Sequence, residues 1–200
     1  MRKLASILIT LVFTFTGVSH AEKAEALDEA AAKAALSQQA VKPKYTPKGP
    51  VKSRTYKLTS KGVGVEIVEY EPEAPGAVPV RVEHPYVAVP ILFVVGKDDL
   101  LDPVSKENVT KTATVLKEIM AADPKAKFII QGHTSAEGDR AFNVALSIDR
   151  ARKIFSLLTS GEGVDSSKLD KVGFGPDYAN ASAKTDSQRQ KDRRVLVVRQ

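Results

Sequence analysis

Residues 87–200 alternate short β-branched runs with two long segments of helical periodicity, which limits the chain to folds that mix helices and strands. The first run, residues 87–95, is almost continuously apolar, as expected for a buried strand. Three later runs, at residues 127–131, 169–174 and 194–198, are also predicted strands. Because strands of this length must be covered on at least one face, we expect the helices to pack on a common sheet.

Both helices have recognisable start signals. Asp102 and Pro103 are a favourable N-cap and first helical residue, and apolar side chains then recur at helical spacing as far as Asp123. The second helix is predicted over residues 139–158, and a short third one near residues 184–191. The fold class is therefore α+β: a β-α-β-α-β-β sandwich with a mixed four-stranded sheet and its helices on one face.

Residues 1–21 have the order of a secretory signal peptide. A basic start at Arg2 and Lys3 is followed by an apolar run over residues 4–18 and by small residues up to Ala21. The apolar run is shorter than the roughly 20 residues of a spanning helix, so we expect cleavage after Ala21, and an uncleaved anchor is the alternative. No later segment is apolar enough for a spanning helix.

Composition narrows the function further. The chain has no cysteine, which excludes a disulfide framework, a thiolate zinc site, a cysteine nucleophile and a lipid-modified cysteine. Without Arg2 and Lys3 the chain has 28 basic residues against 24 acidic ones, a net charge of +4 that is too weak to argue for nucleic acid. We expect a protein of the bacterial periplasm, with no metal, no cofactor and no nucleic-acid partner.

The region before residue 87 differs in composition. Residues 22–53, rich in alanine, lysine and then proline, are predicted to form a solvated helix or a disordered arm. Residues 54–86 are predicted to form a small β-hairpin and a proline-rich linker with at most an edge strand. Any contact with outer-membrane or other envelope proteins is assigned to residues 22–86.

The segment over residues 130–151, IQGHTSAEGDRAFNVALSIDRA, is the most informative about function. Residues 132–138 join a strand end to a helix start, where free N–H groups and the helix dipole favour an anion. Within the helix, Asn143, Ser147 and Arg150 fall at i, i+4 and i+7, so they form a polar stripe beside the apolar face. A solvated helix edge has the same spacing, which leaves both interpretations open.

Together with RQKDRRV at residues 189–195, this stretch resembles the OmpA-like carboxy-terminal domain of OmpA, peptidoglycan-associated lipoproteins and flagellar stator proteins. The family pattern is GHTD, a glycine, NxxLSxxRA and finally RxxNRRV. The resemblance extends over residues 87–200. The matching residues are, in order, Gly132, His133, Thr134, Gly138, Asn143, Leu146, Ser147, Arg150, Ala151, Arg189, Arg193, Arg194 and Val195.

This resemblance implies non-covalent binding of peptidoglycan through the diaminopimelate residue of its stem peptide. The family's motif aspartate takes the ligand ammonium, and its motif arginine, here Arg150, takes a carboxylate as a forked pair. Ser135 stands at the aspartate position and supplies no countercharge. The ligand-binding residues that the resemblance implies are Ser135, Arg150, Thr134, Asn143 and Arg194.

Other residues of the motif have local alternatives. Glu137 and Asp139 follow Ser135 closely and are candidates to replace the missing countercharge. Asp192, where the family has asparagine, is expected to pair with Arg189 or Arg193. Of the two arginines at 193 and 194, one is expected to face the site and the other solvent.

Two functions from different classes remain open at this stage. The first is an exported, non-enzymatic cell-wall-binding protein. The second keeps the OmpA-like fold without wall binding, as a periplasmic protein-interaction or assembly scaffold, because of Ser135. An exported hydrolase is disfavoured, since the predicted domain has no G-x-S-x-G elbow, and His133 is expected to shape a loop.

Overall fold

The computed structural model describes residues 23–41, 47, 49–72, 74 and 77–200. The expected signal peptide lies outside these residues. Within this described part, no helix is both long and apolar enough to cross a membrane.

The elements form one six-stranded sheet with the strand order β1-β2-β3-β6-β4-β5. Strands β4 and β5 pair in parallel, and the other neighbours are antiparallel. In chain order the elements are α1 (Glu29–Ser37), β1 (Val51–Leu58), β2 (Val63–Tyr70), β3 (Val80–Val89), α2 (Pro103–Ala122), β4 (Phe128–His133), α3 (Arg140–Ser156), the π-helical turn η1 (Leu157–Gly161), the 3-10 turn η2 (Ser166–Lys168), β5 (Leu169–Gly175), α4 (Asp186–Gln190) and β6 (Val195–Arg199).

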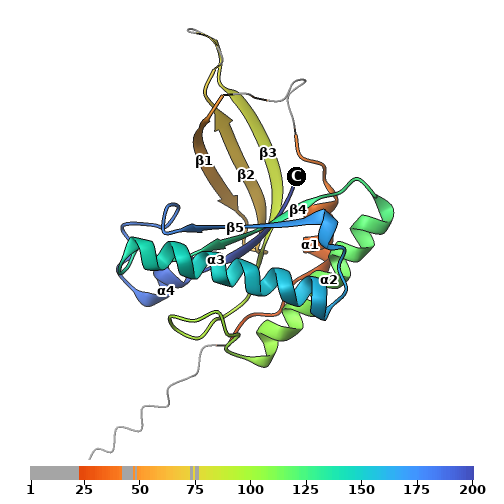
Figure 1. Cartoon of the computed structure of the whole chain (residues 1–200), viewed down its shortest axis with the longest axis vertical. Helices are drawn as coiled ribbons and strands as arrows, with labels where there is room; N and C mark the ends of the chain where they lie inside the picture. Colours follow the sequence, from red (N-terminus) through yellow and green to blue (C-terminus); the bar gives the residue numbers. More distant parts are fainter. Residues whose placement is uncertain (1–22, 42–46, 48, 73, 75–76) are drawn as a thin grey trace, which may run out of the picture.

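The prediction of a mixed sheet with helices in β-α-β-α-β-β order is confirmed by β3 through β6, but the prediction of four strands is wrong. The reason is that β2 pairs with β3 along its whole length, from Val63 opposite Val87 to Tyr70 opposite Val80. The hairpin β1–β2 thus continues the main sheet instead of standing apart from it (Figure 1). Strand β3 also runs through the domain boundary that was expected after residue 86.

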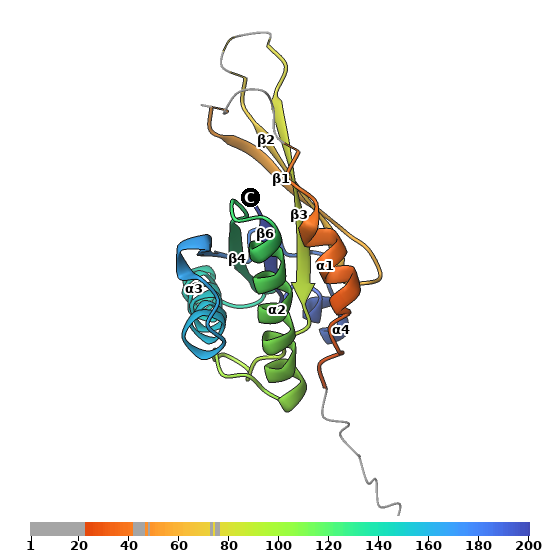
Figure 2. The same cartoon turned by 90° about the vertical axis from the view of Figure 1, so that its right-hand side faces the viewer.

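Helices α1, α2 and α3 cover one face of the sheet, as Figures 1 and 2 show. Alternate strand residues point into the core beneath them, as the two-residue period of a strand requires. The strand residues in this core are Val87, Val89, Phe128, Ile130, Leu169, Val195 and Val197. Their neighbours Tyr86, Leu196 and Val198 pack on the opposite face.

Residues 23–41 of the amino-terminal arm pack against the domain, where a solvated helix or a disordered arm was expected. Helix α1 packs against α2 and β3 with Ala32 and Leu36 buried. The side-chain oxygen of Asn108 accepts a 2.8 Å hydrogen bond from the Leu27 N–H, and Arg199 donates a 2.8 Å hydrogen bond to the Leu36 carbonyl. The buried apolar residues of this segment are only Leu27, Ala32 and Leu36, which form no continuous apolar stripe in the sequence, so the pattern indicated a solvated helix.

Helix α3 approaches the ends of β4 and β5 very closely at two glycines. A Cβ on Gly132 would lie 2.1 Å from the Ser147 carbonyl oxygen, and one on Gly173 would lie 2.4 Å from the Ile148 nitrogen. The Ser147 hydroxyl accepts a 2.8 Å hydrogen bond from the Gly175 N–H. Glycine is therefore needed at positions 132 and 173 so that the helix backbone can contact the strand backbone.

On the opposite face the sheet curls, so that β1 reaches across to β4. The Tyr56 hydroxyl donates a 3.0 Å hydrogen bond to the Gln131 side chain, although β1 and β4 are not neighbours in the sheet. His133, only 2% exposed, packs its ring against Tyr56, Phe174 and Tyr178 at centroid distances of 5.3, 5.5 and 6.2 Å. Neither ring nitrogen of His133 has a hydrogen-bond partner among the described residues.

Gly132→Ala is expected to lower the free energy of unfolding by about 1–3 kcal/mol, because the new Cβ would overlap the Ser147 carbonyl. Gly161→Ala is the matched control, since a Cβ there meets no atom within 4 Å. Urea denaturation of the parent and both variants measures the difference. Equal stability of Gly132→Ala and the parent would contradict the close approach of α3.

Acid is expected to destabilise the protein through His133. Burial, with a further contribution from Arg194 and Arg54, lowers the pKa of His133 to about 3, whereas the unfolded chain takes up this proton near pH 6.5. Because the unfolded state binds more protons in that window, the free energy of unfolding falls as the pH falls, by about 2 kcal/mol between pH 7.5 and 5. His133→Phe should remove this part of the pH dependence in urea titrations; an unchanged dependence would refute it.

Candidate functional site

A pocket of about 390 Å³ opens where β4 ends and α3 begins. Its walls come from the loop before α2, the loop between β4 and α3, the part of α3 from Phe142 to Arg150, and α4 with the residues after it. The residues that line it are Ile91, Leu92, Phe93, Val95, Gly96, Leu101, Thr134, Ser135, Glu137, Phe142, Asn143, Leu146, Arg150, Asp186, Gln190 and Arg193.

Arg150 is the buried cation of this pocket. It is 5% exposed, its Nε donates a 3.0 Å hydrogen bond to the Lys97 carbonyl, and its guanidinium lies 4.7 Å from the centre of the Phe93 ring. Among the described residues no carboxylate lies within ion-pair distance of it. A buried cation without a counterion is unfavourable, so the arrangement favours the arrival of an anion.

The lowered pKa of Arg150 also indicates that its charge lacks a counterion. Burial lowers the pKa of Arg150 to about 10, the positive charge of Arg193 adds to this effect, and Asp98 opposes it. The guanidinium therefore remains protonated at neutral pH. A carboxylate bound beside it would restore the pKa and could accept two parallel hydrogen bonds.

Thr134 and Ser135 form the wall of the pocket at the end of β4. The Thr134 N–H donates a 3.0 Å hydrogen bond to the Gly175 carbonyl, which continues the ladder beyond the strand. The Thr134 hydroxyl is buried without a hydrogen-bond partner in the described part of the chain. Since Ser135 is also buried and also lines the pocket, this wall offers a ligand hydroxyl groups and no charge.

Asn143 holds the loop between β4 and α3 in shape. Its side-chain nitrogen donates a 2.6 Å hydrogen bond to the Glu137 carbonyl, and its N–H donates a 3.0 Å bond to the Asp139 carbonyl. Gly138, between them, has a φ of +83°, a conformation that glycine adopts without strain. Asn143 thus lines the pocket while its amide nitrogen is committed to the loop.

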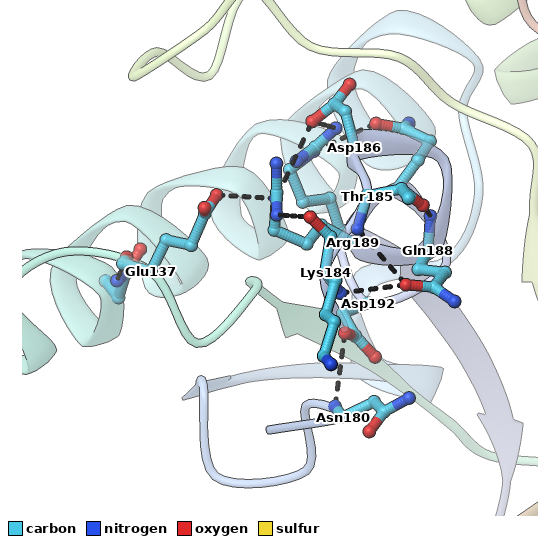
Figure 3. A network of polar contacts seen from close by, with 11 residues as sticks. Glu137, Asn180, Lys184, Thr185, Asp186, Gln188, Arg189 and Asp192 are labelled. Carbon is cyan, nitrogen blue, oxygen red and sulfur yellow. Dashed lines mark hydrogen bonds and ion pairs between the residues drawn. The ribbon is translucent and has the colours of Figure 1, made fainter. Parts of the chain in front are cut away.

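The carboxylates near the pocket are already engaged. Glu137 pairs with Arg189 at 2.8 Å (Figure 3), and Asp186 pairs with Arg193 at 2.9 Å. Asp139 caps α3 by accepting a 2.7 Å hydrogen bond from a backbone N–H in the first turn. Neither candidate to replace the family's aspartate, Glu137 or Asp139, is free to do so in this structure.

Asp192 also differs from its expected pairing. Its carboxylate accepts a 3.1 Å hydrogen bond from the Asn180 N–H (Figure 3) and lies 3.6 Å from Arg194, so it pairs with neither Arg189 nor Arg193. It fixes the loop before α4 against the start of β6.

The structure brings together four of the five residues that the resemblance implied: Thr134, Ser135, Asn143 and Arg150. It places Arg194 on the opposite face of the sheet, where its guanidinium lies 5.4 Å from the Tyr56 ring centre. The two-residue period of β6 explains this, because Arg194 alternates with the core residue Val195, whereas Arg193 lines the pocket.

Two residues that contact Arg150 come from the loop after β3. Phe93 and Lys97 belong to this loop, which folds back on itself through a bridge between Phe93 and Leu100. Lys97 contributes through its backbone carbonyl, a group that every residue has. Only the register of β6 in the sheet could have identified Arg193, and not Arg194, as the arginine that lines the pocket.

The chain is similar in sequence to an outer membrane protein and to a peptidoglycan-associated lipoprotein. Outer membrane protein Omp38 of Acinetobacter baumannii is 33% identical over 134 residues, which is 66% of this chain and 36% of that protein. The peptidoglycan-associated lipoprotein of Haemophilus influenzae is 32% identical over 76 residues, which is 38% of this chain and 49% of that protein. The chain therefore spans about a third to a half of the length of these relatives.

A solved structure supports the fold alone. The periplasmic domain of Helicobacter pylori MotB superposes with a TM-score of 0.51 at 15% identity, over 58% of this chain and 81% of that one. The sequence model of the OmpA family matches residues 92–193, which is 102 of the 200 residues and includes the whole pocket apart from Ile91. On this match, and as the motif residues indicated, the chain belongs to the OmpA family.

Proposed function

We propose that this chain is a cell-envelope protein that binds peptidoglycan non-covalently, with the Arg150 pocket receiving the carboxylate of diaminopimelate in a stem peptide. The observation that carries the proposal is the buried guanidinium of Arg150, which has no ion-pair partner among the described residues. A carboxylate is the group that matches a guanidinium in charge and in planar geometry.

The surroundings of Arg150 prepare it for this role. The Lys97 carbonyl occupies Nε and the Phe93 ring supports the plane of the guanidinium, so the two terminal nitrogens are left for a ligand. Holding the fork in place before binding reduces the side-chain entropy lost on association. The unpartnered Thr134 hydroxyl offers a further hydrogen bond to the bound group. This is recognition, and we assign no reaction to it.

The names of the relatives support a place in the envelope. One is an outer membrane protein and another a peptidoglycan-associated lipoprotein. We therefore propose that the chain lies in the periplasm in association with the wall or outer membrane. Contacts with other envelope proteins through residues 22–86 remain a prediction. Because α1 is packed against α2, the free edge of β1 is the part of that region best placed for them.

Replacing the buried guanidinium tests the pocket. Arg150→Ala is expected to weaken co-sedimentation with purified sacculi by at least about thirtyfold, the effect of removing one partner of a buried charge pair. Arg150→Lys, which keeps the charge but loses the fork, should bind with intermediate affinity. The matched control is Arg152→Ala on the same helix, because Arg152 is exposed and pairs with Asp149 outside the pocket.

Circular dichroism melting separates binding from folding in this experiment. Arg150→Ala loses the Lys97 hydrogen bond and the Phe93 contact but also removes a buried charge that has no counterion, so the variant should stay folded with a melting temperature only modestly below that of the parent. A folded Arg150→Ala that sediments as the parent does would exclude this pocket as the wall site. It would then favour the scaffold function.

A further inference from the structure

The pocket contains cations but no free anion among the residues that the structure describes. Glu137 and Asp186, its two carboxylates, are each within 2.9 Å of an arginine nitrogen, and Asp186 also lies 4.0 Å from Arg189. Ser135 at the base of the loop is neutral. A ligand group that enters beside Ser135 therefore meets the unpaired positive charge of Arg150, while the charge of Arg193 is already balanced by Asp186.

This environment is unfavourable for a free amino acid. In a zwitterion such as the end of a diaminopimelate side chain, the ammonium and the carboxylate are attached to the same carbon. When the carboxylate docks on Arg150, the ammonium is placed nearby, loses water and finds no countercharge. Breaking the Glu137–Arg189 pair to supply one would leave Arg189 with only its longer 4.0 Å contact to Asp186.

An acylated amine meets no such difficulty. An amide has no charge, and its N–H and carbonyl match hydroxyl groups that can both donate and accept. Ser135 and Thr134 present two such hydroxyls, and the one on Thr134 is buried without a partner. Three exposed apolar side chains, Val95, Leu101 and Phe142, also line the pocket and would cover the carbon atoms of an acyl group.

We propose that the pocket accepts an amino-acid carboxylate whose neighbouring amine is acylated, and does not require a free ammonium. This rests on the proposed function and specifies the ligand of the same site. In peptidoglycan it is the chemistry of a diaminopimelate residue whose side-chain amine has been consumed in a cross-link. The domain would then bind cross-linked wall as well as, or better than, wall with free amines.

Two synthetic stem peptides test the proposal by calorimetry. One carries diaminopimelate with its side-chain amine free, and the other carries the same amine acetylated. The parent is expected to bind the acetylated peptide at least as tightly as the free one. Ser135→Asp should reverse the preference and favour the free amine by about tenfold, because it restores a countercharge for the ammonium.

Ser135→Asn is the matched control, since it has nearly the shape of aspartate without the charge. It should keep the parent's preference. The relative affinity of the parent for the two peptides is measured without any variant, so the proposal can be tested even if Ser135→Asp does not fold.

The outcomes separate this proposal from the proposed function. A parent that binds the free amine more than about threefold more tightly would overturn the preference stated here while peptidoglycan binding still stands. If the parent binds neither peptide, or if Arg150→Ala binds both peptides as tightly as the parent does, the ligand preference and the proposed function are both overturned.

Discussion

The contact of α3 with the ends of β4 and β5 determines both the packing and the site. Without side chains at Gly132 and Gly173, the helix backbone lies against the strand backbone, and the Ser147 hydroxyl fixes the distance through the Gly175 N–H. Arg150 lies less than one turn further along the same helix. Any substitution that moves the helix away from the sheet therefore also moves the guanidinium relative to the loop that forms the opposite wall of the pocket.

The two faces of the sheet serve different purposes. The helical face holds the apolar core and, at its edge, the pocket. The opposite face holds an aromatic and polar cluster, in which Glu66 is buried between Arg54 and Gln131 under the curled hairpin. Burial raises the pKa of Tyr86 on this face to about 12. Arg193 and Arg194 lie directly before β6, where successive side chains point to opposite faces of the sheet. Arg193 therefore lines the pocket, and Arg194 packs against Tyr56 on the other face.

Features that depend on neighbouring residues could be predicted from the sequence, whereas features that depend on contacts between distant residues could not. The helices that begin after Asp102 and Asp139 could be predicted because their capping carboxylates and apolar period lie within one segment. The six-stranded sheet could not be predicted, because β2 and β3 pair through residues that are 10 to 24 positions apart in the chain. In the site, the positions of Thr134, Ser135 and Arg150 came from a family motif, whereas the contribution of the Lys97 carbonyl has no sequence signature at all.

The attachment of the amino-terminal segment determines how mechanical force would enter the domain. One oxygen of Asp102 holds the Ala24 N–H at 2.9 Å while the other caps α2, and Asn108 holds Leu27 about 9 Å further along the helix axis. The segment and the helix run in the same direction here. Tension applied at Ala24 along the helix axis therefore loads the Asp102 and Asn108 hydrogen bonds together, instead of breaking them one after the other. A domain tethered at that end and held to a rigid network at Arg150 would carry the strain through α2 and α3, and the hairpin would stay unstressed.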